Sequence, residues 1–539
     1  MTVAAGQDLG MDGAVPGLEV RQGGLGSAAQ ATALATLCAV LFLTFLDNTV
    51  VSVGLASVQS SLHAGVTSLQ WVVNGYALTF ASFMLAAGML GDVLGRKRIM
   101  LAGVAVFCAG SVVAATATNV DWLIAGRVIM GIGAAASEPG TLSIIRHIYP
   151  DKETRADALG IWAAVSGLAL ALGPVIGGLL VGASSWRLIF WFNLAVGAVA
   201  FVMASIFVPE SSDRGSRHLD LPGFVLGAVF LASASFAVIQ GEDTGYTTWW
   251  IIALFALSAL AALAFILVEH RSASPVLDVS LYRKGPFVAS NFMAFAAYFG
   301  TFAIFFFTAL YLQVVANASA YQTAIDFMPM ALGLIVASLA TGPWVARAGP
   351  RVPMTVGAVL AAAGILIAAA VLSPHVGFST LGWVLPIAGI GIGIVLVPVT
   401  SVPLTVVPPE RSGMAASATN TSREMGAVFG VAVLGAVVNA KLTGDLAARL
   451  KQIGVPPSFQ NLVLRAVQTG GTSGGAASSA EHSKNATVAK IATKVVDAAY
   501  NAFGSGLHIA LVISGVLILC GAVVAALAVH RTPGETFEL

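Results

Sequence analysis

Long apolar runs alternate with short polar stretches along most of this chain. A membrane-spanning helix needs about 20 mostly apolar residues, and each run is long enough to meet that requirement. The least certain partition separates the seventh and eighth runs, and it depends on placing the stretch GEDTGYTT in a turn outside the membrane. The pattern predicts fourteen spans, at residues 32–56, 70–90, 99–118, 121–145, 157–181, 188–208, 221–240, 249–268, 287–314, 322–346, 353–373, 378–406, 414–440 and 507–529.

The composition indicates an integral membrane protein. Of 539 residues, 57% are hydrophobic and 9% are charged, and the mean hydropathy is +0.89. Soluble domains carry about 25% charged residues. The net charge of +1 and the lack of a basic tract give no reason to expect a nucleic acid partner. Cys38, Cys108 and Cys520 lie inside apolar runs without the spacing of metal ligands, so we expect neither a metal site nor a disulfide framework.

Basic residues predict how the chain is oriented in the membrane, because short cytoplasmic loops are enriched in lysine and arginine. If the first residues are cytoplasmic, the short outer loops hold one such residue, Arg187, and the opposite orientation inverts the ratio. Both termini are therefore expected in the cytoplasm. The short inner loops and tails then hold sixteen: Arg21, Arg96, Lys97, Arg98, Arg146, Lys152, Arg155, Arg214, Arg217, Arg271, Arg283, Lys284, Arg347, Arg351, Arg411 and Arg531.

One connection is much longer than the others. Residues 441–506 are polar, with the Gly/Ser-rich centre TGGTSGGAASSA, and they are expected outside the cell. The flanking stretches LAARLKQI and VAKIATKVVDAAYNAF are amphipathic and predict short helices lying on the outer surface. The alternative is a mobile loop without a role in transport.

The loop after the second span carries the first recognisable motif, in the stretch GMLGDVLGRKRIM. It resembles the G-x-x-x-D-x-x-G-R-K signature of the major facilitator superfamily. Its glycines permit a tight turn, and its aspartate suits a helix amino terminus, where the partial charge is positive. The resemblance implies an inner gate between two helix bundles, whereas the basic residues alone would be simple anchors. The matching residues are Gly88, Asp92, Gly95, Arg96 and Lys97.

The fifth span, GIWAAVSGLALALGPVIGGLL, is similar to the antiporter motif of exporters in that superfamily. Proline bends a helix, and small residues let a neighbouring helix pack closely. Ala169 stands where the family has a further glycine. Glycine-mediated packing without an antiport role is the alternative. The matching residues are Gly160, Gly173, Pro174, Gly177 and Gly178.

The fourth span contains RVIMGIGAAASEPG, which resembles the family's R-x-x-x-G-x-G-A-A stretch through Arg127, Gly131 and Gly133. Arg127 is expected near the outer end of its span, where snorkelling to the surface is an alternative to a buried role. Glu138 follows in the same span, at a position where family members often have an apolar residue. It either serves the substrate of this protein or is hydrogen-bonded within the bundle.

Further blocks, including SWRLIFWFNLAVG and SGMAASATNTSREMGAVFGVAVLG, resemble the fourteen-helix drug:proton antiporters of the EmrB/QacA type. The resemblance covers roughly residues 32–440 and the last span. It implies an all-α membrane protein with the major facilitator fold, in which two six-helix bundles flank a central cavity. The implied division is a flexible cytoplasmic tail (1–30), an amino-terminal bundle (31–210), two inserted helices with loops (211–285), a carboxy-terminal bundle (286–530, including 441–506) and a cytoplasmic tail (531–539).

Two acids in the spans, with Glu138, are candidates for proton coupling. Asp47 lies in the otherwise apolar FLTFLDNTVVSV, where a charge costs at least roughly 2.5–3.5 kcal/mol. A buried carboxylate without a fixed cationic partner can take up and release a proton as water access switches. The alternative for Asp47 is a structural role, satisfied by Thr44, Asn48 or Thr49. Glu424 in the thirteenth span is expected to face the cavity, while its neighbour Arg423 reaches the inner interface.

The ninth span offers a candidate substrate surface. Phenylalanines recur there at alternating steps of three and four residues, which places them on one helix face. Facing a cavity, they would bind flat apolar cations, although such stripes are more often packed or exposed to lipid. The stripe consists of Phe292, Phe295, Phe299, Phe302 and Phe306.

The resemblance implies a monomeric, proton-driven exporter of hydrophobic, cationic or amphiphilic small molecules such as antibiotics, in the plasma membrane. We expect no cofactor, because the proton gradient supplies the energy and no G-x-x-x-x-G-K-[ST] motif is present. An exporter of a native metabolite and a proton-coupled uptake transporter are the alternatives. A membrane enzyme is not expected, since the histidines form no H-E-x-x-H or similar cluster.

Overall fold

The computed structural model describes most of the chain. The described residues are 27–211, 220–272, 275, 277–372, 378–407, 412–453, 455, 460 and 486–529. All regular elements within these ranges are helical.

The first half of the chain builds seven α-helices. The first two, α1 (Ser27–Val50) and α2 (Leu55–Leu62), form one continuous span through the 3₁₀ turn η1 (Val51–Gly54). The rest are α3 (Val66–Leu94), α4 (Arg96–Ala115), α5 (Val120–Ile148), α6 (Lys152–Ala183) and α7 (Arg187–Phe207).

The second half begins with α8 (Leu221–Thr244) and α9 (Trp249–Arg271), followed by the 3₁₀ turn η2 (Val279–Arg283). The next span is built from α10 (Gly285–Ala303), the π-helical segment η3 (Ile304–Thr308) and α11 (Ala309–Val314). The remaining helices are α12 (Ala320–Ala348), α13 (Arg351–Val371), α14 (Phe378–Val406), α15 (Ser412–Ile453) and α18 (Ala486–Ala528).

Local chemistry explains where several helices begin and end. Glycines with positive φ follow the last residues of α3, α8 and α12, where L side chains would be strained. Side chains accept hydrogen bonds from first-turn amides at four helix starts. The glycines are Gly95, Gly245 and Gly349, and the capping residues are Asn119, Asp151, Asp220 and Ser319.

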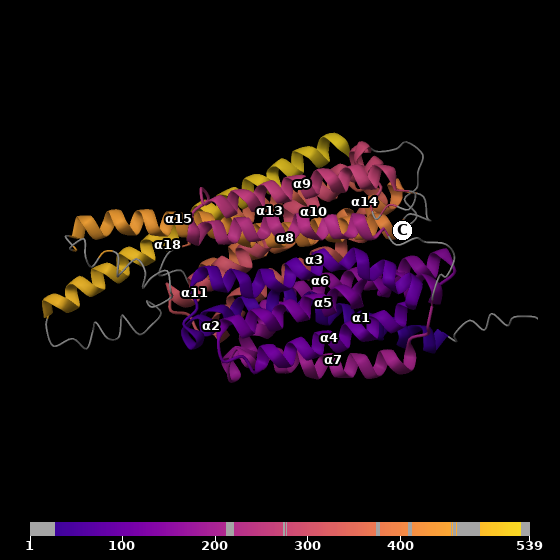
Figure 1. Cartoon of the computed structure of the whole chain (residues 1–539), viewed down its shortest axis with the longest axis horizontal. Helices are drawn as coiled ribbons and strands as arrows, with labels where there is room; N and C mark the ends of the chain where they lie inside the picture. The colour runs from indigo at the N-terminus through magenta and orange to yellow at the C-terminus, as the bar shows by residue number, and fades with distance from the viewer. Residues whose placement is uncertain are drawn as a thin grey trace, which may run out of the picture.

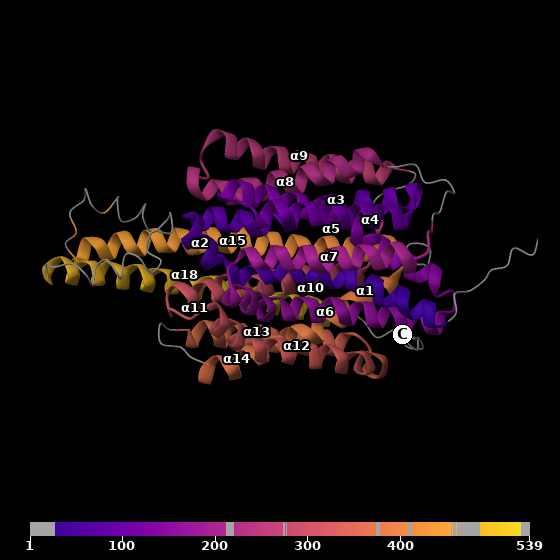
Figure 2. The same cartoon turned by 90° about the horizontal axis from the view of Figure 1, so that it is seen from below.

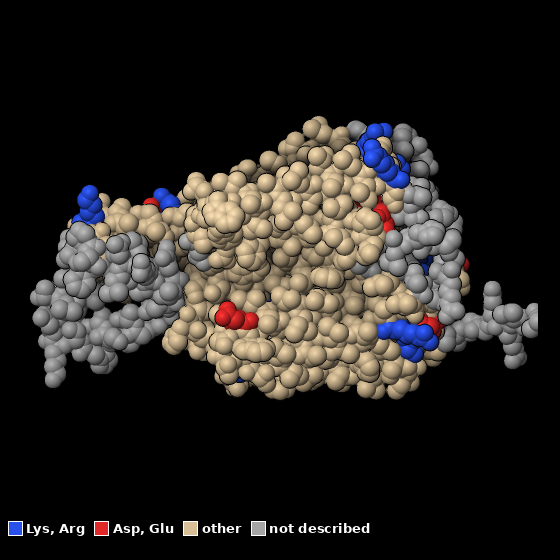
Figure 3. Space-filling view, viewed as in Figure 1, with Lys and Arg blue, Asp and Glu red and all other residues tan. Residues whose placement is uncertain are grey.

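The helices confirm the predicted membrane architecture. Thirteen helices in the described ranges are long and apolar enough to cross a membrane. The 29-residue α3 packs against α5 and α8 and completes the fourteen predicted spans. On the face drawn in Figure 3, charged side chains lie near the two ends and leave an uncharged band between them. The molecule therefore has the surface of a membrane-spanning bundle.

The helices pack as two groups that meet along two seams. Helices α1 and α3–α7 pack against one another, as do α10, α12–α15 and α18 (Figure 1). One seam is formed by α6 and α12, and the other by α3 and α15. The inserted pair lies at one edge in Figure 2, where α8 contacts both α3 and α15 and thus borders the second seam.

The long connection has a different form from the one predicted. Its flanks do not make separate surface helices, because they continue α15 to Ile453 and start α18 at Ala486. At 1.5 Å per residue, 42 residues extend about 63 Å, roughly twice the hydrocarbon thickness. Leu442, Leu446 and Leu450 are buried in this extension. Packing of these leucines explains why the flanks continue α15 and α18 instead of lying on the membrane surface. The Gly/Ser-rich centre lies outside the described residues.

Candidate transport site

Asp47 is held by two side chains from other helices. It is fully buried on α1, and its Oδ2 forms an ion pair with Arg127 of α5. Its Oδ1 accepts a hydrogen bond from Asn193 Nδ2 of α7 at 2.6 Å. Both carboxylate oxygens are thus satisfied, and Asp47 joins three helices of the first group. The premise that Asp47 lacks a fixed cationic partner is wrong.

Arg127 is equally enclosed. Its Nε donates to the Val72 carbonyl at 2.9 Å, and its guanidinium lies 4.4 Å from the centre of the Tyr76 ring. The Tyr76 hydroxyl donates in turn to the Thr44 carbonyl on α1 at 2.9 Å. Arg127 has no exposed surface, so the snorkelling alternative is wrong. A guanidinium supplies enough donors to satisfy a carboxylate and a carbonyl together.

Glu138 and Glu424 lie in a second buried cluster, which crosses between the two groups of helices. Glu424 of α15 accepts a hydrogen bond at 3.5 Å from Asn48 Nδ2 of α1. Glu138 of α5 accepts one at 3.2 Å from Asn420 Nδ2 of α15. The Oε2 atom of each glutamate has no hydrogen-bond partner among the described residues. Each carboxylate is therefore buried with half of its hydrogen-bonding capacity unused.

Arg423 lies in the same cluster rather than at the inner interface, so that part of the prediction is wrong. It is 2% exposed, and its NH1 group donates to Asn420 Oδ1 at 3.2 Å. Its guanidinium carbon is 5.6 Å from the centre of the Tyr298 ring on α10. Neither Glu138 nor Glu424 forms an ion pair with it among the described residues. Asn420 instead links the arginine to Glu138 by hydrogen bonds.

The two glycines of the fourth-span motif place α5 between its neighbours. A Cβ at Gly131 would collide with Thr79 Oγ1 and the Tyr76 carbonyl of α3, and one at Gly133 would collide with the Phe107 backbone of α4. Only glycine allows such close approach on both sides. This packing brings Arg127 and Glu138 of the same helix to their respective clusters.

The fifth-span motif packs α6 against both groups. A Cβ at Gly173 or Gly177 would collide with Thr49 or Val50 of α1, and one at Gly178 would collide with Ala324 of α12. Pro174 is buried in the helix. The predicted close approach thus holds at these three glycines. Gly160 differs, because it is exposed and a Cβ there would meet nothing within 4 Å.

The loop motif between α3 and α4 is attached to the end of α7. The Arg96 amide donates to the Ser211 carbonyl at 3.0 Å, and the Lys97 amide donates to Glu210 Oε1 at 3.1 Å. Gly95 has a φ of 111° and faces the same carboxylate. Gly88 lies earlier on α3, and a Cβ there would make only ordinary van der Waals contact with α5. These contacts lie within the first group. The side chain of Asp92, the predicted gate residue, is not among those described.

The phenylalanine stripe is packed rather than exposed. Phe295 and Phe299 lie against α15, with Phe295 6.5 Å from Phe429 between ring centres. Phe302 packs on Tyr298 at 6.1 Å, and Phe292 is partly buried. The prediction of one continuous face is wrong at Phe306, because the π-helical segment Ile304–Thr308 breaks the α-helical periodicity before it is reached.

Several residues of the two clusters were missed in the sequence. Asn193 and Asn420 stand inside family-like blocks, but an asparagine alone does not indicate a partner. Asn48 stands out only as a neighbour of Asp47, and Tyr76 carries no sequence signal of its own. Each acquires its role from contacts across 32 to 376 residues of chain, which no local pattern encodes.

The family model described as Major Facilitator Superfamily matches residues 37–431 of the chain. Among curated relatives, multidrug resistance protein Stp of Mycobacterium tuberculosis is 33% identical, with 80% of this chain and 81% of that protein covered. The methylenomycin A resistance protein of Streptomyces coelicolor is also 33% identical, with 81% and 92% covered. The multidrug efflux pump LfrA of Mycolicibacterium smegmatis is 30% identical, with 93% and 96% covered.

Solved structures share the fold at low sequence identity. A bacterial homolog of the human lysosomal transporter Spinster, crystallised in an inward-facing and unoccupied conformation, superposes with a TM-score of 0.61. Its sequence is 18% identical, with 94% of this chain and 100% of that chain covered.

Proposed function

The chain belongs to the major facilitator superfamily, and on that premise we propose that it is a proton-coupled exporter of hydrophobic, cationic or amphiphilic small molecules. Its relatives carry the names of efflux pumps and antibiotic resistance proteins. They support a multi-pass membrane transporter whose cargo is a drug or antibiotic, and they agree with the drug:proton antiporter subfamily.

The observation that carries proton coupling is the pair of buried glutamates between the two groups. Glu138 and Glu424 lack ion-pair partners among the described residues, and each has one unpartnered oxygen. A carboxylate that is removed from water and forms no ion pair is more stable with a proton bound. Asp47 has both oxygens satisfied and a guanidinium beside it. We therefore assign proton binding to Glu138 and Glu424 rather than to Asp47.

The asparagine contacts suggest how protonation changes the seam. Asn48 donates to Glu424 and Asn420 donates to Glu138, so both bonds join the two groups of helices. A protonated carboxyl is a weaker acceptor than a carboxylate. Proton binding would weaken both bonds and favour separation of the groups. Proton loss would restore them, and the two conformations would then expose the site to opposite sides of the membrane.

The cluster also accounts for the cargo. Two ionised glutamates beside one Arg423 leave a net charge of −1, which attracts a cation and favours its competition with a proton. The ring of Tyr298, beside Arg423, offers apolar and cation–π contacts. For a neutral cargo exported per proton, an elementary charge that moves through about 100 mV supplies roughly 2.3 kcal/mol, enough for roughly a 50-fold concentration gradient.

We place both termini in the cytoplasm, on the distribution of lysine and arginine, and the protein in the plasma membrane as a monomer. No cofactor enters this mechanism, because the proton gradient drives it. In this orientation the long extensions of α15 and α18 project outward.

Inverted membrane vesicles that contain the protein test the proposal. Uptake of a panel of lipophilic cations, neutral antibiotics and native metabolites is measured with an acidic vesicle lumen, so that protons flow outward as cargo enters, and again after this gradient is collapsed. We expect accumulation of the lipophilic cations, abolished when the gradient collapses. Accumulation of none of them, or accumulation that survives the collapse, would contradict proton-coupled drug export, and selective uptake of the metabolites would identify a native cargo.

Glu424→Gln and Glu138→Gln should each fold but lose gradient-driven uptake, because glutamine keeps the shape and neither titrates nor carries the charge that attracts a cation. Asp445→Asn is the matched control, since Asp445 lies on α15 outside the cluster and pairs with the partly exposed Lys441. Normal gradient-driven uptake by both glutamine variants would overturn the assignment of proton binding to these residues.

A further inference from the structure

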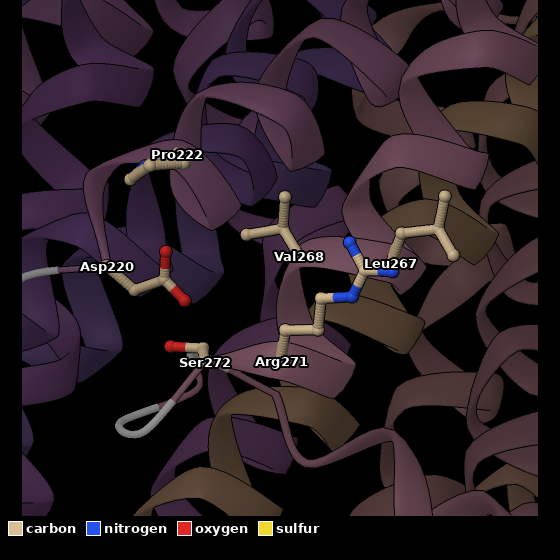
Figure 4. Close-up of a pocket in the computed structure, with 6 residues that line it drawn as sticks. All are labelled: Asp220, Pro222, Leu267, Val268, Arg271 and Ser272. Atoms are coloured by element: carbon tan, nitrogen blue, oxygen red, sulfur yellow. The ribbon is translucent and has the colours of Figure 1, made fainter.

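The start of α8 and the end of α9 border an open surface cavity that no step of the proposed transport uses. Its volume is about 360 Å³, and it is lined by Asp220, Pro222, Leu267, Val268, Arg271 and Ser272 (Figure 4). The inserted helices have no counterpart in the two six-helix bundles, so this cavity is separate from the glutamate cluster. It lies at the membrane edge where both helices meet the loops.

The carboxylate of Asp220 can accept a further hydrogen bond. Its Oδ1 caps α8 by accepting the Gly223 amide at 2.9 Å. The residue is 7% exposed, and its Oδ2 has no hydrogen-bond partner among the described residues. Glu269 of α9 lies against the same turn of α8, beside Gly223. A buried carboxylate oxygen that lacks a donor, near a second carboxylate, favours a ligand with a positively charged N–H group.

Arg271 supplies the opposite charge in the same cavity. It is the last residue of α9, it is exposed, and it forms no ion pair with Asp220 among the described residues. In Figure 4 the guanidinium extends toward Leu267, away from the Asp220 carboxylate. The cavity therefore presents separate anionic and cationic groups. A ligand with both an ammonium and a phosphate would satisfy them together, since guanidinium pairs well with phosphate.

The surroundings indicate that this ligand is a lipid. Helix α9 is the least enclosed of the candidate spans, with 17% of its most apolar window buried. Leu260, Leu263 and Leu267 are exposed along it, and Leu267 also lines the cavity. An acyl chain lying on these leucines would place its headgroup at the level of Arg271, where basic side chains meet lipid phosphates.

We propose that this cavity binds the headgroup of a phospholipid that carries a primary ammonium group, with the ammonium on Asp220 and the phosphate on Arg271. Phosphatidylethanolamine has this chemistry. Phosphatidylcholine has the phosphate but no N–H donor, and phosphatidylglycerol has no cation, so the three lipids separate the two contacts. The proposal concerns binding and does not depend on transport.

The test titrates the purified, delipidated full chain with these three lipids, all with dioleoyl chains, and measures bound lipid by native mass spectrometry. We expect phosphatidylethanolamine to bind roughly tenfold or more tightly than phosphatidylcholine, in line with a hydrogen bond to a charged group. Asp220→Asn keeps an oxygen that can cap Gly223, and it should lose this preference. Arg271→Gln should weaken the binding of both phosphatidylethanolamine and phosphatidylcholine.

Two variants control for general effects of charge. Asp151→Asn changes the capping residue of α6, and Arg347→Gln changes a basic residue in the last turn of α12. Both should bind lipid like the parent protein. Soluble glycerophosphoethanolamine tests whether the headgroup suffices without acyl chains, and we expect it to bind far more weakly than the lipid.

Three results would overturn the proposal. They are an unchanged preference for phosphatidylethanolamine in Asp220→Asn, unchanged binding in Arg271→Gln, and preferred binding of phosphatidylglycerol by the parent protein. Thermal unfolding of each variant establishes that it is folded. If Asp220→Asn fails to fold, the comparison of the three lipids on the parent protein still decides the outcome.

Discussion

At the scale of single residues, Asp47 shows how a charge is kept inside a membrane bundle. Its cost is offset by Arg127 and Asn193, which come from two other helices. A buried ion pair stabilises only when both members are present, since either one alone leaves an uncompensated charge. The pair therefore explains why both ionisable residues persist within apolar spans.

We predict that Asp47→Asn and Arg127→Gln each destabilise the protein by about 3–5 kcal/mol. The double variant should be more stable than either single variant, because no unpaired charge remains. Thermal unfolding in detergent measures all three. The partly exposed pair Lys441–Asp445 is the control, and Lys441→Gln should cost less than about 1 kcal/mol. Single variants as stable as the parent protein would show that the ion pair does not hold these helices together.

At the scale of helices, Pro174 leaves one carbonyl of α6 without its helical donor, and α1 supplies a donor in its place. Proline has no amide proton, so the carbonyl four residues earlier, that of Leu170, loses its helical partner. Thr49 Oγ1 of α1 donates to this carbonyl at 3.0 Å. Gly173 allows the approach, because any Cβ there would collide with Thr49. The proline and the packing of α6 on α1 thus depend on each other.

Replacing Thr49 with valine should destabilise the protein by about 1–3 kcal/mol, because the Leu170 carbonyl is then buried without a donor. Adding Pro174→Ala should recover part of this loss, since the alanine amide can donate to Leu170. Thermal unfolding gives both values. Thr36→Val is the control, because the Thr36 hydroxyl donates within its own helix to the Thr32 carbonyl. Equal losses in the Thr49 and Thr36 variants would contradict this account.

At the scale of the whole molecule, close contacts between the two groups lie at one end among the described side chains. At the end with α2 and α11, Gly178 approaches Ala324 and Gln313 Nε2 donates to the Val53 carbonyl at 2.9 Å. Toward the other end of α6, Gly160 is exposed and has open space beside it. In the orientation proposed above, the end closed in this structure would face outward.

Gly178→Val should therefore separate the outer ends of α6 and α12 and increase the outward-facing population. Spin labels at Ser184 and Asn317, just beyond these helix ends, report the separation by double electron–electron resonance. We expect a longer distance distribution than in the parent protein and a slower export rate. Gly160→Val should change neither, since its side chain meets open space. An unchanged distribution in Gly178→Val would mean that this contact does not keep the outer seam closed.

The sequence by itself determined the number of spans, the fold and the residues of the packing motifs. These properties follow from local patterns, because bilayer thickness sets the length of each apolar run and close helix packing demands small residues such as Gly131, Gly173 and Gly178. The acids at positions 47, 138 and 424 were also recognisable, since a charge within an apolar run is costly wherever the helix lies.

Only the tertiary structure decided which of those acids are paired. Asp47 and Glu424 both lie within apolar runs, but Asp47 pairs with Arg127, 80 residues away, whereas the side-chain hydrogen bond that Glu424 accepts among the described residues comes from the amide of Asn48, 376 residues away. Which side chain a buried carboxylate faces depends on how helices rotate and cross. The continuation of α15 and α18 beyond the membrane was likewise decided by leucines that bury only when the two helices pack together. Hydropathy records where a helix can cross a bilayer, and contact between distant helices determines what its polar residues do there.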